Sequence, residues 1–198
     1  MTRIKLCGIT RLCDIEVLNH VKPEYIGFVF AQNSRRYVTP DKAYTLKSAL
    51  SSDIKAVGVF VDAPVSEVAG LLENDIIDIA QLHGHEDEDY IRGLKALCNK
   101  PVIKAFRIGC GEDLADIDEC TADYVLLDSG AGSGESFDWG LIKDIKRPYF
   151  LAGGLSADNV RDAINILHPF AVDASSGIET GGFKDEEKIR TFIKAVRG

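Results

Sequence analysis

The stretch Ile4-Lys5-Leu6-Cys7-Gly8-Ile9-Thr10 is the first apolar run of the chain, and its first four side chains alternate. The two aliphatic residues share one face of a predicted strand, while Lys5 and Cys7 share the other face. The glycine that follows allows the backbone to turn sharply. The sequence therefore predicts a strand that carries an amine and a thiol on one face and ends at a loop.

Seven more short apolar runs follow, and each is joined to the next by a segment with helical spacing or helix-start residues. The eight strand-and-helix units take roughly 25 residues each, which is short for the barrel class. The later strands are predicted at Tyr25–Phe30, Ile54–Val61, Ile76–Leu82, Pro101–Phe106, Tyr124–Leu127, Tyr149–Leu151 and Phe170–Ala174. Helices are predicted after Thr10, from Thr39-Pro40, from Pro64, after Gly84, around Leu114, over Asp138–Ile145, from Ser156 and from about Asp185.

Alternating strands and helices imply a parallel sheet, but eight units permit either a closed barrel or an open, doubly wound sheet. An open dinucleotide-binding sheet has its glycine-rich turn after the first strand. Here the glycine-rich turns follow strands six, seven and eight, where barrels bind phosphate. The sequence therefore predicts an α/β fold, a single-domain (β/α)8 TIM barrel with parallel strands over residues 1–198.

Composition and net charge indicate which class of protein the chain belongs to. The hydrophobic share of 45% and the charged share of 27% are typical of globular proteins. No apolar run approaches the roughly 20 residues of a membrane helix, and no signal segment opens the chain, so we expect a cytoplasmic protein without a membrane partner. The net charge of −8 argues against nucleic acid as a partner. Five cysteines without a Cys-x-x-Cys pair indicate reduced thiols.

Polar residues lie at the carboxyl ends of several predicted strands, which is where barrel enzymes place their active sites. A purely structural barrel would fill most of these positions with aliphatic residues. The polar side chains are Lys5, Cys7, Gln81, His83, Lys104, Arg107, Asp128, Asp173 and Ser175. Lys5 and Asp173 have the same parity on strands that become neighbours when the barrel closes, so we expect a buried ion pair that tunes Cys7. The alternative is that Lys5 extends to solvent at the bottom of the barrel.

Two neighbouring loops predict an anion site. Gly153 and Gly154 precede a predicted helix N-terminus, where free N–H groups and the helix dipole favour phosphate. Ser175, Ser176 and Gly177 offer hydroxyls and exposed backbone in the next loop. Either loop alone is a weak signal, because glycine turns commonly end strands. Together they predict a phosphate-binding site.

Cys7 and Asp128 form a predicted acid–base pair. A thiolate can accept a proton if nearby positive charge, from Lys5 or from a bound substrate, lowers its pKa. A carboxyl group in an apolar setting can stay protonated and donate one. Such a pair suits an isomerisation that needs no redox cofactor. The alternatives are that Cys7 is a small core residue and that Asp128 caps the next element.

His83 and His85 stand two residues apart, a spacing that raises the question of a metal site. No further ligands follow at suitable spacing, so no metal is predicted. We expect His83 to line the pocket and His85 to lie in a surface loop.

Eight stretches, spread in order along the chain, together resemble the phosphoribosylanthranilate isomerase family of tryptophan biosynthesis. Each would be weak alone, but the set is highly specific. The stretches are Lys5-Leu6-Cys7-Gly8-Ile9-Thr10, Ser34-Arg35-Arg36-Tyr37-Val38, Val57-Gly58-Val59-Phe60-Val61, Gln81-Leu82-His83-Gly84, Leu126-Leu127-Asp128, Phe137-Asp138-Trp139, Leu151-Ala152-Gly153-Gly154-Leu155 and Asp173-Ala174-Ser175-Ser176-Gly177-Ile178-Glu179.

The resemblance implies an Amadori rearrangement of N-(5-phosphoribosyl)anthranilate to 1-(2-carboxyphenylamino)-1-deoxyribulose 5-phosphate, without a cofactor. By family analogy, Asp128 is the general acid and Cys7 the general base. Arg36 would bind the anthranilate carboxylate, and the loops at Gly154 and Ser175–Gly177 would bind the phosphate. Gln81 and His83 are expected to contact the substrate. We expect a monomer rather than a homodimer.

The sequence departs from the family at two positions where proline is usual. Arg35 stands before Arg36, which leaves the resting pose of Arg36 open, and Gly181 stands in the last loop, which we expect to be more mobile. Two alternatives stay open. The chain could be another phosphosugar isomerase, although the histidine-pathway enzyme is expected to have aspartate where Cys7 stands. It could also be a phosphosugar-binding barrel without catalysis, which the presence of both Cys7 and Asp128 opposes.

Overall fold

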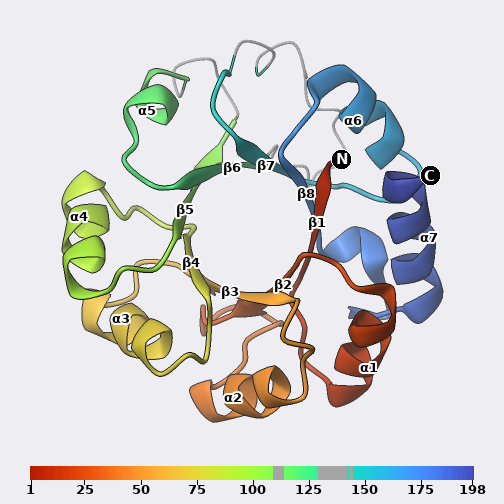
Figure 1. The fold of residues 1–198 in the computed structure, drawn as a ribbon, viewed down its shortest axis with the longest axis horizontal. Helices are drawn as coiled ribbons and strands as arrows, with labels where there is room; N and C mark the ends of the chain where they lie inside the picture. Colours follow the sequence, from red (N-terminus) through yellow and green to blue (C-terminus); the bar gives the residue numbers. More distant parts are fainter. Residues whose placement is uncertain (109–113, 129–141, 143–144) are drawn as a thin grey trace.

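Eight parallel strands form a closed barrel in this computed structural model, which describes residues 1–108, 114–128, 142 and 145–198 (Figure 1). The strands follow chain order around the barrel, and β1 pairs with β8 to close it. They are β1 (Arg3–Cys7), β2 (Tyr25–Val29), β3 (Lys55–Phe60), β4 (Ile79–Leu82), β5 (Val102–Arg107), β6 (Tyr124–Asp128), β7 (Tyr149–Ala152) and β8 (Ala171–Ala174). The predicted (β/α)8 barrel is confirmed.

Helices surround the barrel as an outer ring in Figure 1. They are α1 (Leu12–Val21), α2 (Pro40–Ser48), α3 (Val65–Glu73), α4 (Glu88–Leu97), α5 (Leu114–Glu119), α6 (Val160–Leu167) and α7 (Glu186–Arg197). The short α5 confirms the helix predicted around Leu114. The glycine-rich segment 130–134 and nearly all of the helix predicted over Asp138–Ile145 lie outside the described residues. Among the described residues, none of the helices is long and apolar enough to cross a membrane.

Local sequence explains where the helices begin. Thr39 caps α2 by accepting a hydrogen bond from the Lys42 backbone N–H at 3.3 Å, and Pro40 occupies the first helical position as predicted. The prediction for Ser156 is wrong. Its backbone N–H donates instead to Asn159 Oδ1 at 2.9 Å, which holds residues 156–159 in a turn, and α6 begins only at Val160.

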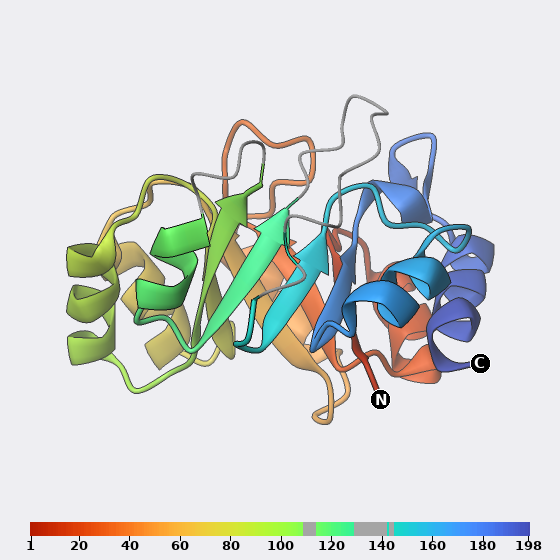
Figure 2. The same ribbon diagram turned by 90° about the horizontal axis from the view of Figure 1, so that it is seen from above.

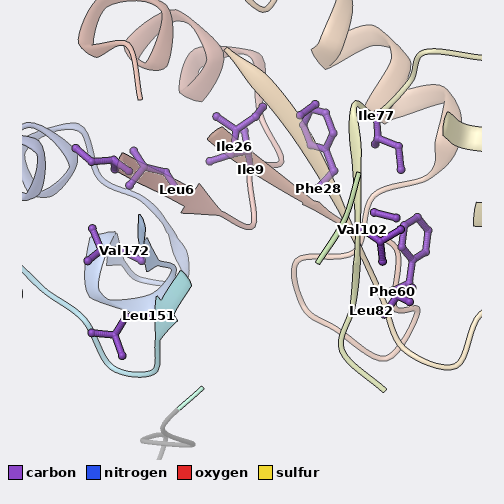
Figure 3. Close-up of a cluster of buried hydrophobic side chains, with 14 of the residues drawn as sticks. Leu6, Ile9, Ile26, Phe28, Phe60, Ile77, Leu82, Val102, Leu151 and Val172 are labelled. Atoms are coloured by element: carbon purple, nitrogen blue, oxygen red, sulfur yellow. The ribbon is translucent and has the colours of Figure 1, made fainter. Parts of the chain in front are cut away.

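Two layers of apolar side chains stabilise the barrel. Outward-facing strand residues such as Phe28 and Leu82 pack in the layer beneath the helices (Figure 3). Inward-facing aromatic rings fill the amino-terminal end of the barrel, with the Tyr25 and Phe150 ring centroids 5.3 Å apart. These rings close the amino-terminal end of the barrel; the carboxyl ends of the strands lie at the opposite end, at the upper edge of Figure 2.

A two-stranded hairpin follows β8 and was not predicted. It comprises β9 (Glu179–Thr180) and β10 (Phe183–Lys184), after a short 3-10 helix η3 (Ser176–Ile178). Both turn residues have positive φ, 60° at Gly181 and 85° at Gly182, as a tight hairpin turn of the mirror-image type requires. Proline cannot adopt a φ of 60°, so Gly181 permits a turn here that the family's usual proline would prevent.

Candidate functional site

A cavity of about 570 Å³ opens at the carboxyl ends of the strands. Its lining combines residues from all eight barrel strands and from the loops that follow several of them. Of the ten predicted site residues, nine line it: Cys7, Arg36, Gln81, His83, Asp128, Gly153, Gly154, Ser175 and Ser176. Arg107 and Asp173 line it as well. The strand-end prediction therefore located the cavity.

Gly177 is the predicted site residue that does not line the cavity. A Cβ atom at this position would lie 2.1 Å from the backbone oxygen of Leu155. The glycine therefore allows the loops after β7 and β8 to pack in direct contact. Gly153 and Gly154 both have positive φ, 94° and 64°, which explains the paired glycines in the first of these loops. The helix N-terminus predicted directly behind them is displaced by the 156–159 turn.

Cys7 lies at the end of β1, 9% exposed, with its sulfur close to β2. A Cβ atom on Gly27 would lie 2.6 Å from the Cys7 Sγ, so the absence of a side chain there makes room for the thiol. Burial raises the pKa of the Cys7 thiol above its ordinary value, although the nearby Lys5 and Lys184 act in the opposite direction. Lys5 therefore lowers the pKa of the Cys7 thiol, as predicted, but the pKa is still raised overall because burial has the larger effect.

Lys5 and Asp173 form the predicted buried ion pair. Lys5 Nζ lies 2.6 Å from Asp173 Oδ2, and the Lys5 side chain is fully buried, so the alternative in which it reaches solvent is wrong. Burial, the largest single effect, disfavours the ammonium, but Asp173 and Cys7 together outweigh it, so the pKa of Lys5 is raised. The pair joins β1 to β8, at the seam where the barrel closes.

Asp128, His83 and Gln81 form a chain of polar contacts across the cavity. His83 Nε2 lies 3.3 Å from Asp128 Oδ2, and His83 Nδ1 lies 3.1 Å from Gln81 Nε2. The imidazole of His83 therefore bridges the Gln81 amide and the Asp128 carboxyl group. The Asp128 side chain is 24% exposed and faces the cavity, which excludes a role limited to capping.

Among the described residues, two buried oxygen atoms in the cavity wall have no hydrogen-bond partner. They are Gln81 Oε1 and Asp173 Oδ1, on side chains that are almost wholly buried. Unpaired buried acceptors are costly in free energy, so their presence beside a cavity points to a ligand that donates hydrogen bonds.

Arg36 reaches the cavity from the loop after β2 and is held by Glu179, which sequence reasoning missed. Arg36 Nε donates to Glu179 Oε1 at 2.6 Å, and Nη2 donates to Oε2 at 2.8 Å. Lys184 Nζ adds a contact to Oε1 at 2.7 Å. Glu179 and Arg36 are 143 residues apart, so no local sequence pattern predicts their contact. The two adjacent cations Arg35 and Arg36 were the one available signal that an anionic side chain lies nearby.

Lys104 was predicted at the active-site rim, and this prediction is wrong. Its neighbours Ile103 and Ala105 point into the barrel, so Lys104 points outward into the helix layer. There Lys104 Nζ donates to the Gly84 carbonyl oxygen at 2.7 Å and contacts Glu86 Oε2 at 3.1 Å. Arg107 has the inward parity and lines the cavity instead.

Within the described part of the chain, no group of three histidine, cysteine or acidic side chains is arranged to hold a metal ion. His83 contacts Asp128 instead. The His85 side chain is 96% exposed and pairs with Asp62, as expected for a surface loop.

Known proteins match this chain over its full length. The family model of N-(5'phosphoribosyl)anthranilate (PRA) isomerase matches residues 4–195. An N-(5'-phosphoribosyl)anthranilate isomerase of Clostridium acetobutylicum is 46% identical over 206 residues, covering 100% of this chain and 98% of the relative.

Solved structures agree with the sequence match. The phosphoribosyl anthranilate isomerase of Thermotoga maritima superposes with a TM-score of 0.91 at 36% identity, over 100% of both chains. Another isomerase structure, in complex with reduced 1-(o-carboxyphenylamino)-1-deoxyribulose 5-phosphate, gives a TM-score of 0.89 at 35% identity, again over 100% of both chains. With the family model, the curated relative and the barrel in agreement, the chain belongs to the N-(5'-phosphoribosyl)anthranilate isomerase family.

Proposed function

We propose that this chain converts N-(5-phosphoribosyl)anthranilate to 1-(2-carboxyphenylamino)-1-deoxyribulose 5-phosphate in tryptophan biosynthesis, with Asp128 as general acid and Cys7 as general base. The observation that carries the proposal is the meeting of these two side chains, from β6 and β1, in the wall of one cavity. The rearrangement moves hydrogen within one molecule and is redox-neutral, so an acid and a base suffice.

In the first step, Asp128 donates its proton to the ring oxygen of the ribose and the C1′–O bond breaks. The open-chain product is an iminium ion, with its positive charge on the C1′–N unit. His83 Nε2 lies 3.3 Å from Asp128 Oδ2, so the imidazole lies beside the carboxylate that remains after proton transfer.

In the second step, Cys7 removes the proton from C2′ and the electron pair moves toward the iminium nitrogen. The resulting enaminol tautomerises to the ketone product, in which the 2′-hydroxyl has lost its proton and C1′ has gained one. Burial alone keeps Cys7 as the thiol, so the base form needs positive charge beside it. Lys5 and Lys184 supply part of this charge, and the iminium ion supplies the rest at the moment when the base is required.

The rest of the cavity suits the two ends of this substrate. The loops with Gly153, Gly154, Ser175 and Ser176 offer backbone N–H groups and hydroxyls for the phosphate. Arg36 would bind the ring carboxylate through its planar guanidinium. The unpaired acceptors Gln81 Oε1 and Asp173 Oδ1 would receive hydrogen bonds from sugar hydroxyls.

The first experiment follows the fluorescence of phosphoribosylanthranilate generated in situ. The wild-type chain is expected to consume it rapidly, and Cys7→Ser and Asp128→Asn are each expected to lower kcat by at least about 100-fold, the contribution of a positioned acid or base. Circular dichroism of each variant provides the control for folding.

The same experiment separates the alternatives. A Cys7→Ser variant with full turnover would contradict the acid–base assignment. A folded wild-type chain without turnover would favour a different phosphosugar isomerase or a binding barrel without catalysis, and other phosphosugars would then be screened. We further propose that the enzyme acts in the cytoplasm and as a monomer.

A further inference from the structure

Glu179 is a buried carboxylate that the proposed reaction does not use, and three cations surround it. Its Oε1 lies 2.6 Å from Arg36 Nε and 2.7 Å from Lys184 Nζ, and its Oε2 lies 2.8 Å from Arg36 Nη2 and 2.9 Å from Arg35 Nη2. The Glu179 side chain is only 5% exposed. One anion among three cations leaves excess positive charge beside the cavity, where a second carboxylate would be attracted.

The contact with Glu179 fixes which edge of the Arg36 guanidinium remains available. A guanidinium can bind a carboxylate in a bidentate manner through its Nε–Nη2 edge or through its Nη1–Nη2 edge. Glu179 occupies the first edge. Among the described residues, Arg36 Nη1 has no hydrogen-bond partner, and Arg36 lines the cavity. The second edge can therefore receive a ligand.

The stem of Arg36 is held as well as its head. A Cβ atom on Gly8 would lie 2.3 Å from Arg36 Cδ, so the arginine stem crosses directly over the backbone after β1. The Arg36 backbone N–H donates to Ser34 Oγ at 3.1 Å. With both ends of the side chain fixed, the orientation of the guanidinium is set before a ligand arrives.

Glu179 in turn is held by the hairpin. Glu179 and Lys184 are opposite partners in the β9–β10 pairing, so the register itself brings their side chains together. Lys184 Nζ also donates to the Ser175 carbonyl oxygen at 2.9 Å, in the loop proposed to bind phosphate. The hairpin therefore connects Arg36 to that loop through two side chains.

We propose that Glu179 is a positioning residue that orients Arg36 toward the ring carboxylate of the substrate, and that the β9–β10 hairpin links this carboxylate subsite to the phosphate loop. This inference rests on the proposed function, because it names the group that Arg36 binds. Although burial opposes ionisation, hydrogen bonds from Arg36 and Lys184 hold the pKa of Glu179 at about 2, so Glu179 is an anion at neutral pH.

The test compares two ligands by isothermal titration calorimetry on the full chain. One is reduced 1-(o-carboxyphenylamino)-1-deoxyribulose 5-phosphate, and the other is its counterpart with a phenyl ring that lacks the carboxylate. In Glu179→Gln, the affinity for the carboxylated ligand is expected to fall about tenfold, because a charge-assisted contact loses its geometry. The affinity for the second ligand is expected to stay within about twofold.

Arg35→Gln is the matched control. Arg35 contacts the same Glu179 oxygen atom as Arg36 Nη2 but has a 62% exposed side chain and does not line the cavity. This variant is expected to leave both affinities within about twofold of wild type. In kinetics, Glu179→Gln is expected to raise KM more than it lowers kcat, since the reacting atoms are not touched.

Equal loss of affinity for both ligands in Glu179→Gln would overturn the proposal, because it would indicate a purely structural role. If that variant does not fold, Glu179→Gln combined with Lys184→Met removes the carboxylate together with its buried cation, and the same comparison decides. A wild-type chain that neither turns over phosphoribosylanthranilate nor binds the carboxylated ligand would refute the proposed function, and this inference with it.

Discussion

At the scale of single residues, Lys5 and Asp173 each depend on the other to compensate a buried charge. Both charges are buried, and the two side chains come from the first and last strands of the barrel. A buried ion pair contributes little net stability compared with apolar residues, but removing one partner leaves an uncompensated charge. Each residue of the pair is therefore tolerated in the barrel interior only when the other is present.

Lys5→Met is expected to lower the free energy of unfolding by about 3–5 kcal/mol, because the Asp173 charge stays buried without its cation. Denaturation in urea, followed by circular dichroism, measures the change. Lys22→Met is the control, since Lys22 forms an exposed pair with Asp53 and its loss is expected to cost at most about 1 kcal/mol. A Lys5→Met variant with wild-type stability and activity would contradict the pair's role.

The Cys7 thiol offers a pH-dependent prediction. Its pKa is raised above the ordinary value of 9.0 by burial, so the reactive thiolate forms in the unliganded protein only at higher pH. Alkylation of Cys7 by iodoacetamide, measured by mass spectrometry of peptides, is expected to be slow at pH 7 and to accelerate above about pH 9. The exposed Cys13 serves as the internal reference. Fast modification of Cys7 at pH 7 would show that its cationic neighbours outweigh burial.

Residue-level prediction from the sequence succeeded where strand parity decided the outcome. Cys7, Gln81, His83 and Asp128 all have inward parity at strand ends, and all line the cavity. The prediction for Lys104 was wrong because the sequence did not show which residues of the fifth strand point into the barrel. Lys104 and Arg107 have opposite parity, so the sequence itself showed that they could not both point inward.

At the scale of elements, the β9–β10 hairpin depends on its two glycines. No atom of the described residues lies within 4 Å of a Cβ added at Gly181, so backbone conformation is what opposes a substitution there. Gly181→Ala is expected to destabilise the protein by about 1 kcal/mol, because alanine at a φ of 60° is strained. Thermal unfolding measured by differential scanning calorimetry tests this.

Gly93 in α4 provides the opposite case for the same substitution. It is an exposed helical glycine, and an added Cβ would have no atom of the described residues within 4 Å, leaving out the helix's own nearby backbone. Gly93→Ala is expected to stabilise the protein by about 0.5–1 kcal/mol, because alanine favours the helix. Equal effects of the two substitutions, in either direction, would contradict a strained turn at Gly181.

The eight barrel strands could be predicted because each is a run of apolar residues bounded by turn residues. The hairpin could not be predicted from the sequence, because two-residue strands are too short to show alternation. Its two strands are paired through the polar residues Glu179 and Lys184 rather than through an apolar pattern. The start of α6 was misplaced for a related reason. Ser156 and Asn159 are both good capping residues, and only the observed hydrogen bond decides between them.

At the scale of the whole molecule, the exposed apolar residues are dispersed. Among the described residues, the large ones come from the N-terminus, different helices, a turn and the hairpin, namely Met1, Leu12, Tyr44, Val61, Leu97, Ile166 and Phe183. Stable interfaces usually need a contiguous apolar patch. Size-exclusion chromatography with light scattering is therefore expected to give the 21.6 kDa mass of one chain at micromolar concentration. A mass of two chains would contradict the proposed monomer.

The seam between β1 and β8 also bears on how the chain is made. Lys5 and Asp173 are 168 residues apart, so during vectorial synthesis the first strand emerges long before the strand that completes the barrel. Until then β1 is an edge strand, and an inward-pointing charge is one of the devices that keep such edges from pairing with other chains. We expect Lys5 to be such a charge on β1, opposing edge pairing until Asp173 on β8 arrives as its partner.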